Sequence, residues 1–95
     1  MSESLNDNRK QDLCKLLAEN LPTLRTKMGI SQNELADRIG YSRQTISAIE
    51  RMENDMQWRM FSVIVPFFAT DEEIYRLMLV MSILDEDVMT TLNIK

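Results

Sequence analysis

The stretch of residues 31–50, SQNELADRIGYSRQTISAIE, constrains the fold most, because it predicts two short helices joined by a very short turn. Ser31 and Glu34 have the spacing of a capping box, which satisfies free backbone donors at the start of a helix. Gly40 is suited to end this helix, since glycine takes a positive φ angle at little cost. Ser42 is a good N-cap for the next helix. Because one residue separates Gly40 from Ser42, the two helices must meet at a tight turn.

Apolar residues recur at helical spacing on both predicted helices, which indicates that they share a core. Two small residues, Ala36 and Ala48, allow the helices to cross closely. The opposite face of the second helix is polar. The apolar positions are Leu35, Ala36, Ile39, Ile46 and Ile49, and the exposed polar positions are Arg43, Gln44, Ser47 and Arg51, with Thr45 beside them.

The polar set has the chemistry that DNA readout uses. Arginine can bond two acceptors of a guanine, and glutamine can bond two positions on an adenine. Serine and threonine can reach phosphates. These side chains lie around the start of the second helix, where free backbone N–H groups and the helix dipole also attract phosphate. Gln32 has a matching place at the start of the preceding helix.

The rest of the chain is also predicted to be helical, so the fold class is all-α. Pro66 is expected to kink or shorten its helix, because proline lacks a donor and crowds the preceding turn. Residues 88–95 are ambiguous between a helical turn, a short strand and a frayed end. The expected helices are 8–19, 20–28 with Asn20 as N-cap and Pro22 in its first turn, 56–69, and one that begins at a Thr70–Glu73 capping box and includes Leu84.

Composition excludes several classes of protein. The chain has no histidine, which removes Cys-His and Ser-His catalysis and most zinc sites, so we expect no enzyme, cofactor or metal site. Cys14 is the single cysteine, which fits a reducing cytoplasm. The longest apolar run, residues 63–69, is too short to cross a membrane, and residues 1–10 lack the apolar core of a signal peptide.

Charge is distributed unevenly along the chain. The net charge is −4, yet residues 23–51 carry +2 while residues 71–95 carry −4. A protein can have one basic face and still be acidic overall. The negative total therefore does not exclude a nucleic-acid partner.

Several short elements occur in a fixed order: Leu24-Arg25, Gly29-Ile30-Ser31-Gln32, Glu34-Leu35-Ala36, Ile39-Gly40 and Ile46-Ser47-x-Ile49-Glu50. Together they make residues 20–52 resemble the helix-turn-helix of the lambda-repressor and Cro-like (xenobiotic-response-element type) family of bacterial and phage regulators. The resemblance implies a compact five-helix bundle, to which the helix at 8–19 is an addition. It also implies that residues 31–40 form the supporting helix and residues 42–52 the recognition helix.

The resemblance implies roles for individual residues. Gln32 would touch phosphate and support the first residues of the recognition helix, and Ser42 would meet the DNA backbone. Arg25 and Glu50 match a family pair that forms an internal salt bridge. The residues expected to contact DNA are Gln32, Ser42, Arg43, Gln44, Thr45, Ser47 and Arg51.

The sequence departs from the family pattern after the recognition helix. Met52 stands where the family often has glycine, and the usual proline near Met56 is absent. Asn54 is the residue expected to supply the left-handed backbone conformation instead.

These features predict a sequence-specific DNA-binding regulator, a repressor, that binds double-stranded DNA as a homodimer. Residues 1–19 would be an N-terminal extension, 20–69 the helix-turn-helix core and 70–95 a dimerisation element, within one compact domain. Apolar residues off the core stripes suggest the dimer, although the helix at 8–19 could cover them: Val63, Phe67, Val80 and Ile83. Two alternatives remain: an antitoxin that holds a basic toxin with its acidic C-terminal half, or a protein-interaction module without DNA binding.

Overall fold

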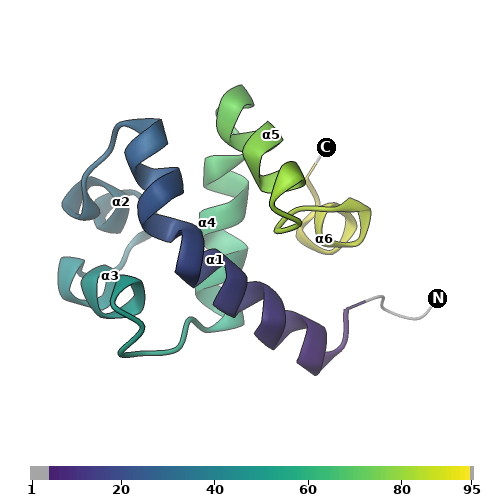
Figure 1. The fold of residues 1–95 in the computed structure, drawn as a ribbon, viewed down its shortest axis with the longest axis horizontal. Coiled ribbons are helices and arrows are strands. Elements are labelled where there is room, and N and C mark those ends of the chain that lie inside the picture. Colours follow the sequence, from purple (N-terminus) through teal and green to yellow (C-terminus); the bar gives the residue numbers. More distant parts are fainter. Residues whose placement is uncertain (1–4, 95) are drawn as a thin grey trace.

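The computed structural model describes residues 5–94, which form six helices and no strand. The all-α class is therefore confirmed. The Cα radius of gyration of the molecule is 12.6 Å, close to the value of about 12 Å expected for a compact chain of this length. The helices are α1 (Asp7–Met28), α2 (Gln32–Ile39), α3 (Arg43–Glu50), α4 (Trp58–Phe68), α5 (Glu72–Val80) and α6 (Glu86–Leu92), shown in Figure 1.

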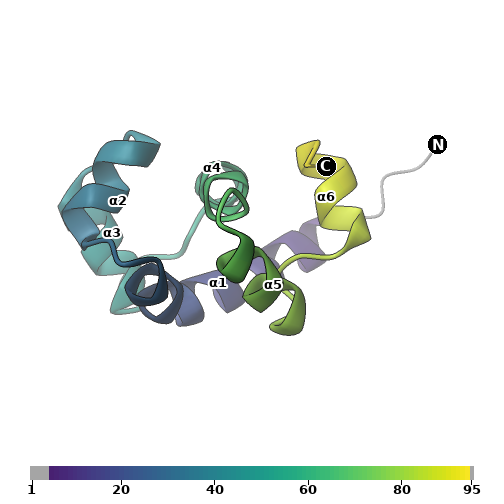
Figure 2. The same ribbon diagram turned by 90° about the horizontal axis from the view of Figure 1, so that it is seen from above.

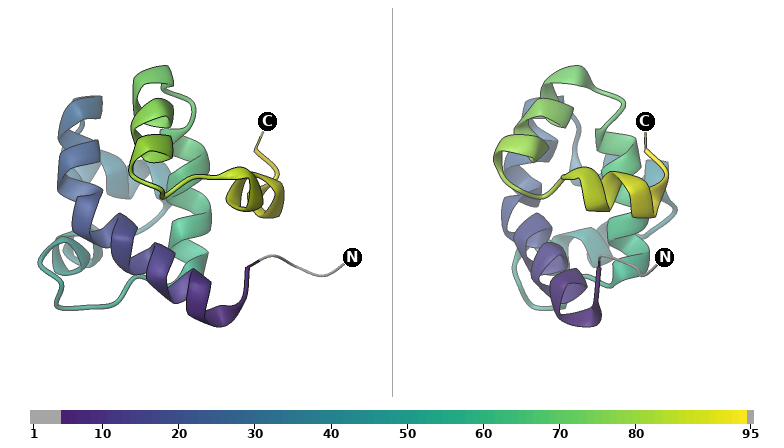
Figure 3. Two further views of the ribbon diagram at one scale, coloured as in Figure 1. Left: turned by 45° about the vertical axis from the view of Figure 1, so that its right-hand side comes forward. Right: turned by 90° about the vertical axis from the view of Figure 1, so that its right-hand side faces the viewer.

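The long helix α1 joins the two ends of the bundle. It contacts α3, α4 and α5. Figures 2 and 3 show the α2–α3 pair at one side of the molecule and α6 at the opposite side, with α4 and α5 between them. The fully buried core is formed mainly by α1 leucines, α4 aromatic and aliphatic residues and α5, including Leu17, Leu21, Phe61, Ile64, Phe68 and Ile74.

The predicted boundary between two N-terminal helices at Asn20 is wrong, because α1 is continuous through Pro22. A proline inside a helix costs about 3 kcal/mol. Leu17, Leu21 and Leu24 are each 0% exposed, and burying such side chains contributes about 1.5–3 kcal/mol apiece, which outweighs that cost. The Asn20 side chain does not cap a helix but donates to the Leu16 carbonyl at 2.9 Å.

The predicted helix at 56–69 is α4, which begins at Trp58 and ends at Phe68, two residues after Pro66. One other local prediction is corrected by the structure. The N-cap of α5 is Asp71, whose Oδ1 accepts from the Ile74 N–H at 3.1 Å, and not Thr70. Thr70 instead donates its hydroxyl to the Phe67 carbonyl at 2.7 Å, so the predicted capping box is absent.

The C-terminal region folds back onto the start of α1. Of the ambiguous residues 88–95, Val88 to Leu92 lie in α6, whose N-cap Asp85 accepts from the Val88 N–H at 2.9 Å, and Lys95 lies outside the described residues. Arg9 forms an ion pair with the same Asp85 carboxylate. Ile83 is 0% exposed, so its predicted place outside the core is wrong. Among the described helices, none has the length and hydropathy needed to cross a membrane.

Candidate nucleic-acid interface

The turn between α2 and α3 is built by local hydrogen bonds. Ser31 Oγ accepts from the Glu34 N–H at 3.0 Å, and Glu34 Oε1 accepts from the Ser31 N–H at 2.8 Å, which completes the predicted capping box. Gly40 has φ of 80° and ends α2, as predicted. Ser42 Oγ then accepts from the Thr45 N–H at 3.1 Å and caps α3. The backbone therefore reverses between two helices that are each well terminated.

Buried aliphatic side chains fix the angle between α2 and α3. Leu35 and Ile46 are 0% exposed, and Ala36 is 1% exposed. Because protein cores are close-packed, a change of crossing angle would open voids around these residues. The exposed face of α3 is consequently held in a fixed orientation relative to the bundle.

An ion pair joins the end of α1 to the end of α3. Arg25 Nε lies 2.8 Å from Glu50 Oε2, and Arg25 Nη2 lies 3.1 Å from Glu50 Oε1. Only 16% of the Arg25 side chain and 7% of the Glu50 side chain are exposed. The hydrogen bond to Glu50 raises the pKa of Arg25 above its ordinary value. Arg25 also donates to the Ile30 carbonyl at 3.0 Å, so it braces the segment that leads into α2.

Gln32 belongs to this same network. Its Nε2 donates to Glu50 Oε1 at 2.9 Å. The contact is with the last residue of α3, whereas the family resemblance implied support for the first residues of that helix. Because an amide nitrogen has two hydrogens, Gln32 retains a second donor that this hydrogen bond does not use.

The first turn of α3 presents polar side chains to solvent. Ser42, Arg43 and Gln44 are exposed, and Thr45 is half-buried. Neither Arg43 nor Gln44 makes a side-chain hydrogen bond within residues 5–94, while Ser42 Oγ and Thr45 Oγ1 lie 2.9 Å apart. The two residue types suited to base recognition are thus available to an external partner.

Ser47 and Arg51 form a separate cluster one to two turns further along α3. Arg51 Nη1 donates to Ser47 Oγ. The other two nitrogens of Arg51, Nε and Nη2, donate to the Glu53 carboxylate at 2.9 and 3.0 Å. These hydrogen bonds lower the pKa of Glu53. Glu53 is not among the residues that the sequence predicts for the site, because its contact depends on the backbone turn after α3.

Comparison with known families supports the geometric description. A family model described as Helix-turn-helix matches residues 23–55. The matched residues cover about a third of the chain, and they contain the α2–α3 pair, so this segment is similar to the helix-turn-helix family. No curated protein and no solved structure matches the chain. The match supports a DNA-binding helix-turn-helix regulator.

The helix-turn-helix ends in an unusual turn. Met52 has φ of 60°, so the methionine itself takes the left-handed conformation, and the prediction that Asn54 would do so is wrong. The turn is closed by hydrogen bonds from the Met52 N–H to the Ile49 carbonyl at 3.0 Å and from the Glu53 N–H to the Ala48 carbonyl at 2.9 Å. The turn thereby places Glu53 beside the end of α3.

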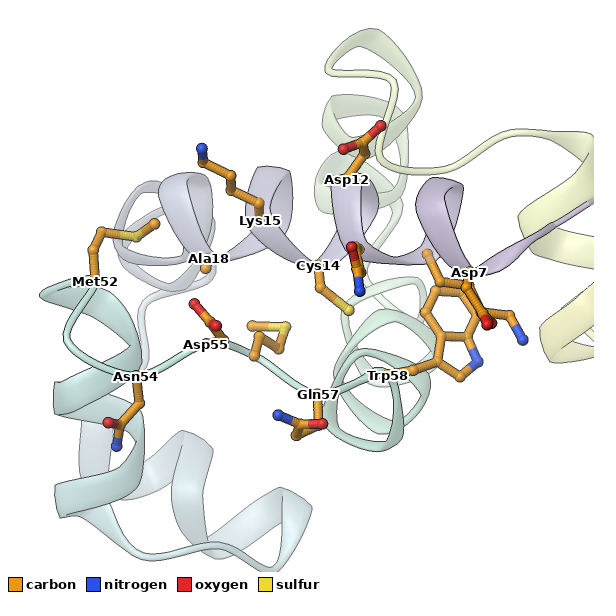
Figure 4. Close-up of a pocket in the computed structure, with 13 residues that line it drawn as sticks. Asp7, Asp12, Cys14, Lys15, Ala18, Met52, Asn54, Asp55, Gln57 and Trp58 are labelled. Atoms are coloured by element: carbon orange, nitrogen blue, oxygen red, sulfur yellow. The ribbon is translucent and has the colours of Figure 1, made fainter.

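A cavity of about 630 Å³ lies between α1 and the segment that follows the helix-turn-helix, as Figure 4 shows. Met52 and Trp58 lie at opposite ends of it, and Cys14 lies on its α1 wall. Burial raises the pKa of Cys14 to about 11, so the thiol is protonated at neutral pH. The residue is 5% exposed and belongs to the buried core. Within residues 5–94, no group of three or more acidic, histidine or cysteine side chains could hold a metal ion.

Proposed function

We propose that this protein is a sequence-specific DNA-binding transcription regulator, and that it acts as a repressor in the cytoplasm. The observation that carries the proposal is the exposure of Arg43 and Gln44 on the first turn of a helix whose angle is fixed by a buried crossing. A helix of this kind fits the major groove, where its N-terminal residues meet base edges.

The proposed roles follow from the chemistry of each side chain. Arg43 would bond a guanine and Gln44 an adenine. Ser42, Thr45 and the second amide donor of Gln32 would hold the DNA backbone and set the pose. Ser47 lies one turn behind the base-reading residues, and Arg51, the C-cap of α3, would contact a phosphate. The Arg25–Glu50 pair would maintain the angle of α3 without touching DNA.

We further propose that the protein binds as a homodimer through residues 70–95. Val80 is 81% exposed on α5, and its neighbour Leu79 is 39% exposed, so this helix has apolar surface that a second copy of the chain would cover. A two-fold dimer of this motif would read two half-sites about 34 Å apart. The operator should therefore be a near-palindrome.

Selection of bound sequences from a random DNA pool tests this function. A sequence-specific dimer enriches a motif with two half-sites one helical turn apart. Enrichment of no motif, although the protein is folded and binds the pool, would reduce the function to non-specific DNA binding. No binding to any DNA at low salt would favour the protein-interaction module instead.

An antitoxin is the second candidate, and the acidic C-terminal half is the observation that favours it. Residues 71–95 carry −4, and Glu72, Glu73 and Glu86 are exposed at the starts of α5 and α6. A basic toxin would bind this end of the bundle while the helix-turn-helix binds DNA. Co-purification with the product of the adjacent gene, lost when the three glutamates are changed to glutamine, would support this candidate.

A further inference from the structure

We propose that Glu53 competes with DNA phosphate for Arg51 and so lowers the affinity of the helix-turn-helix for DNA of every sequence. This inference rests on the proposed function, because it assumes that the exposed face of α3 meets DNA. Its subject is a residue that lies outside α3 and that the family resemblance does not assign to the site.

The contact between Glu53 and Arg51 has the form of a phosphate contact. The Glu53 carboxylate accepts from Nε and from Nη2 of Arg51, at 2.9 and 3.0 Å. Arginine binds carboxylate and phosphate in the same way, with two parallel N–H donors. The third nitrogen, Nη1, is turned toward Ser47 Oγ. All three nitrogens of the Arg51 guanidinium thus have partners within the protein.

The turn after α3 holds Glu53 in this position. The Glu53 N–H donates to the Ala48 carbonyl at 2.9 Å, and Met52 takes the left-handed conformation that redirects the chain. Because the backbone of Glu53 is hydrogen-bonded to α3, its carboxylate lies beside Arg51. The fold therefore places a competitor for phosphate next to this arginine.

The pair is nevertheless accessible to a ligand. The Arg51 side chain is 56% exposed and that of Glu53 is 58% exposed. Exposed ion pairs are weak, so a phosphate can replace Glu53. The displaced carboxylate would then lie close to a phosphate, and the like charges would repel each other. Binding through Arg51 therefore gains less than a phosphate contact normally supplies.

Glu53 is expected to affect the affinity for DNA but not the preference for particular bases. Phosphate contacts carry no sequence information, so Glu53 would weaken binding to operator and random DNA alike. Base contacts from Arg43 and Gln44 lie at the other end of α3 and would be unaffected. Glu53 would thus keep non-specific occupancy low while leaving sequence preference unchanged.

The test compares Glu53→Gln with Asp55→Asn by measuring DNA affinity against salt concentration. Asp55 is exposed in the same turn and makes no hydrogen bond to Arg51, so its change removes an equal charge without releasing that arginine. In the parent, the nearby Glu53 charge offsets the charge that Arg51 brings to a phosphate. Glu53→Gln removes this offset, so in effect one more phosphate is neutralised and the log–log salt slope becomes steeper by about 0.9. If Glu53→Gln and the parent bind DNA equally at about 1 M salt, this slope difference makes the variant bind about eightfold more tightly at about 0.1 M salt. Asp55→Asn should keep the parental slope.

Adding Arg51→Ala to Glu53→Gln should abolish the gain and return the slope to that of Arg51→Ala alone. A folded Glu53→Gln variant with the parental slope, with the same change as Asp55→Asn, or with weaker binding would overturn the inference. In each of these cases the parent protein still binds DNA, and the proposed function stands. If the folded parent binds no DNA at low salt, the proposed function fails and the role of Glu53 fails with it.

Discussion

Arg25 and Glu50 are joined by two hydrogen bonds, of 2.8 and 3.1 Å, that link the end of α1 to the end of α3. Gln32 adds a third hydrogen bond to the same carboxylate from the start of α2. Three helices thus converge on one buried carboxylate. The orientation of the recognition helix depends on this junction as much as on the apolar crossing.

Breaking this pair should destabilise the fold. Arg25→Ala leaves the Glu50 carboxylate, only 7% exposed, without its cation, and such a loss costs about 3 kcal/mol. Urea unfolding followed by circular dichroism measures this cost. The double variant Arg25→Met/Glu50→Gln should cost less than the sum of its single variants, by about 0.5–3 kcal/mol. Strictly additive effects would show that the two residues do not interact.

Replacing Met52 by glycine should stabilise the protein. Met52 has φ of 60°, a conformation that costs most residues about 1–2 kcal/mol, whereas glycine adopts it freely. Glycine also has greater backbone freedom in the unfolded chain, which destabilises the folded state by about 0.5–1 kcal/mol. The net stabilisation expected for the variant is therefore about 0.5–1 kcal/mol. The side chain is 48% exposed, so little packing is lost. Asn54→Gly is the control, because φ at Asn54 is not positive. Thermal unfolding measures the stability of both variants, and an equal change in the two would contradict the prediction.

Asp85 should make stability depend on pH in the acid range. Burial disfavours its charged form, but hydrogen bonds from the Val88 N–H and from Arg9, together with the Arg9 charge, lower its pKa below the ordinary value. A lowered pKa contributes stability above the unfolded pKa of about 3.9, and that stability is lost as pH falls through the lower folded value. Unfolding measured from neutral pH down to below pH 4 should therefore show an acid-side decline that Asp85→Asn reduces. An unchanged decline in that variant would assign the acid sensitivity to other carboxylates.

The oligomeric state should depend on Val80. A charge at this 81% exposed position would be solvated in a monomer but buried in a dimer formed through α5, so Val80→Glu should dissociate the dimer. Sedimentation velocity of the parent, Val80→Glu and Gln11→Glu, an exposed change on α1, makes the comparison. A monomeric parent, or an unchanged dimer in Val80→Glu, would argue against this interface.

The helix pair could be predicted from sequence because its signals are local. The Ser31 capping box, Gly40 and Ser42 each act within a few residues of themselves, and the structure retains all of them. The continuity of α1 could not be predicted in this way. Local rules place Pro22 at a helix start, whereas burial of Leu17 and Leu21 on one face of a single helix decides the outcome.

The unpredicted parts of the site depend on backbone geometry beyond the helices. Arg51 and Glu53 are two residues apart, a spacing that does not bring side chains together within a helix. They meet because Met52 turns the chain with a left-handed conformation that methionine seldom takes. Gln32 likewise contacts the end of α3, at Glu50, through the angle at which the two helices cross.

The central claim is that the first turn of α3 reads bases, and Arg43→Ala tests it most directly. Motif selection from random DNA should be run on the parent, on Arg43→Ala and on Arg59→Ala, which removes an equal charge from an exposed position on α4. Arg43→Ala should lose preference at one base pair in each half-site and weaken operator binding by about 1–3 kcal/mol, while Arg59→Ala keeps the parental motif. If Arg43→Ala selects the parental motif with parental affinity, α3 does not read DNA through Arg43, and the proposed recognition is wrong.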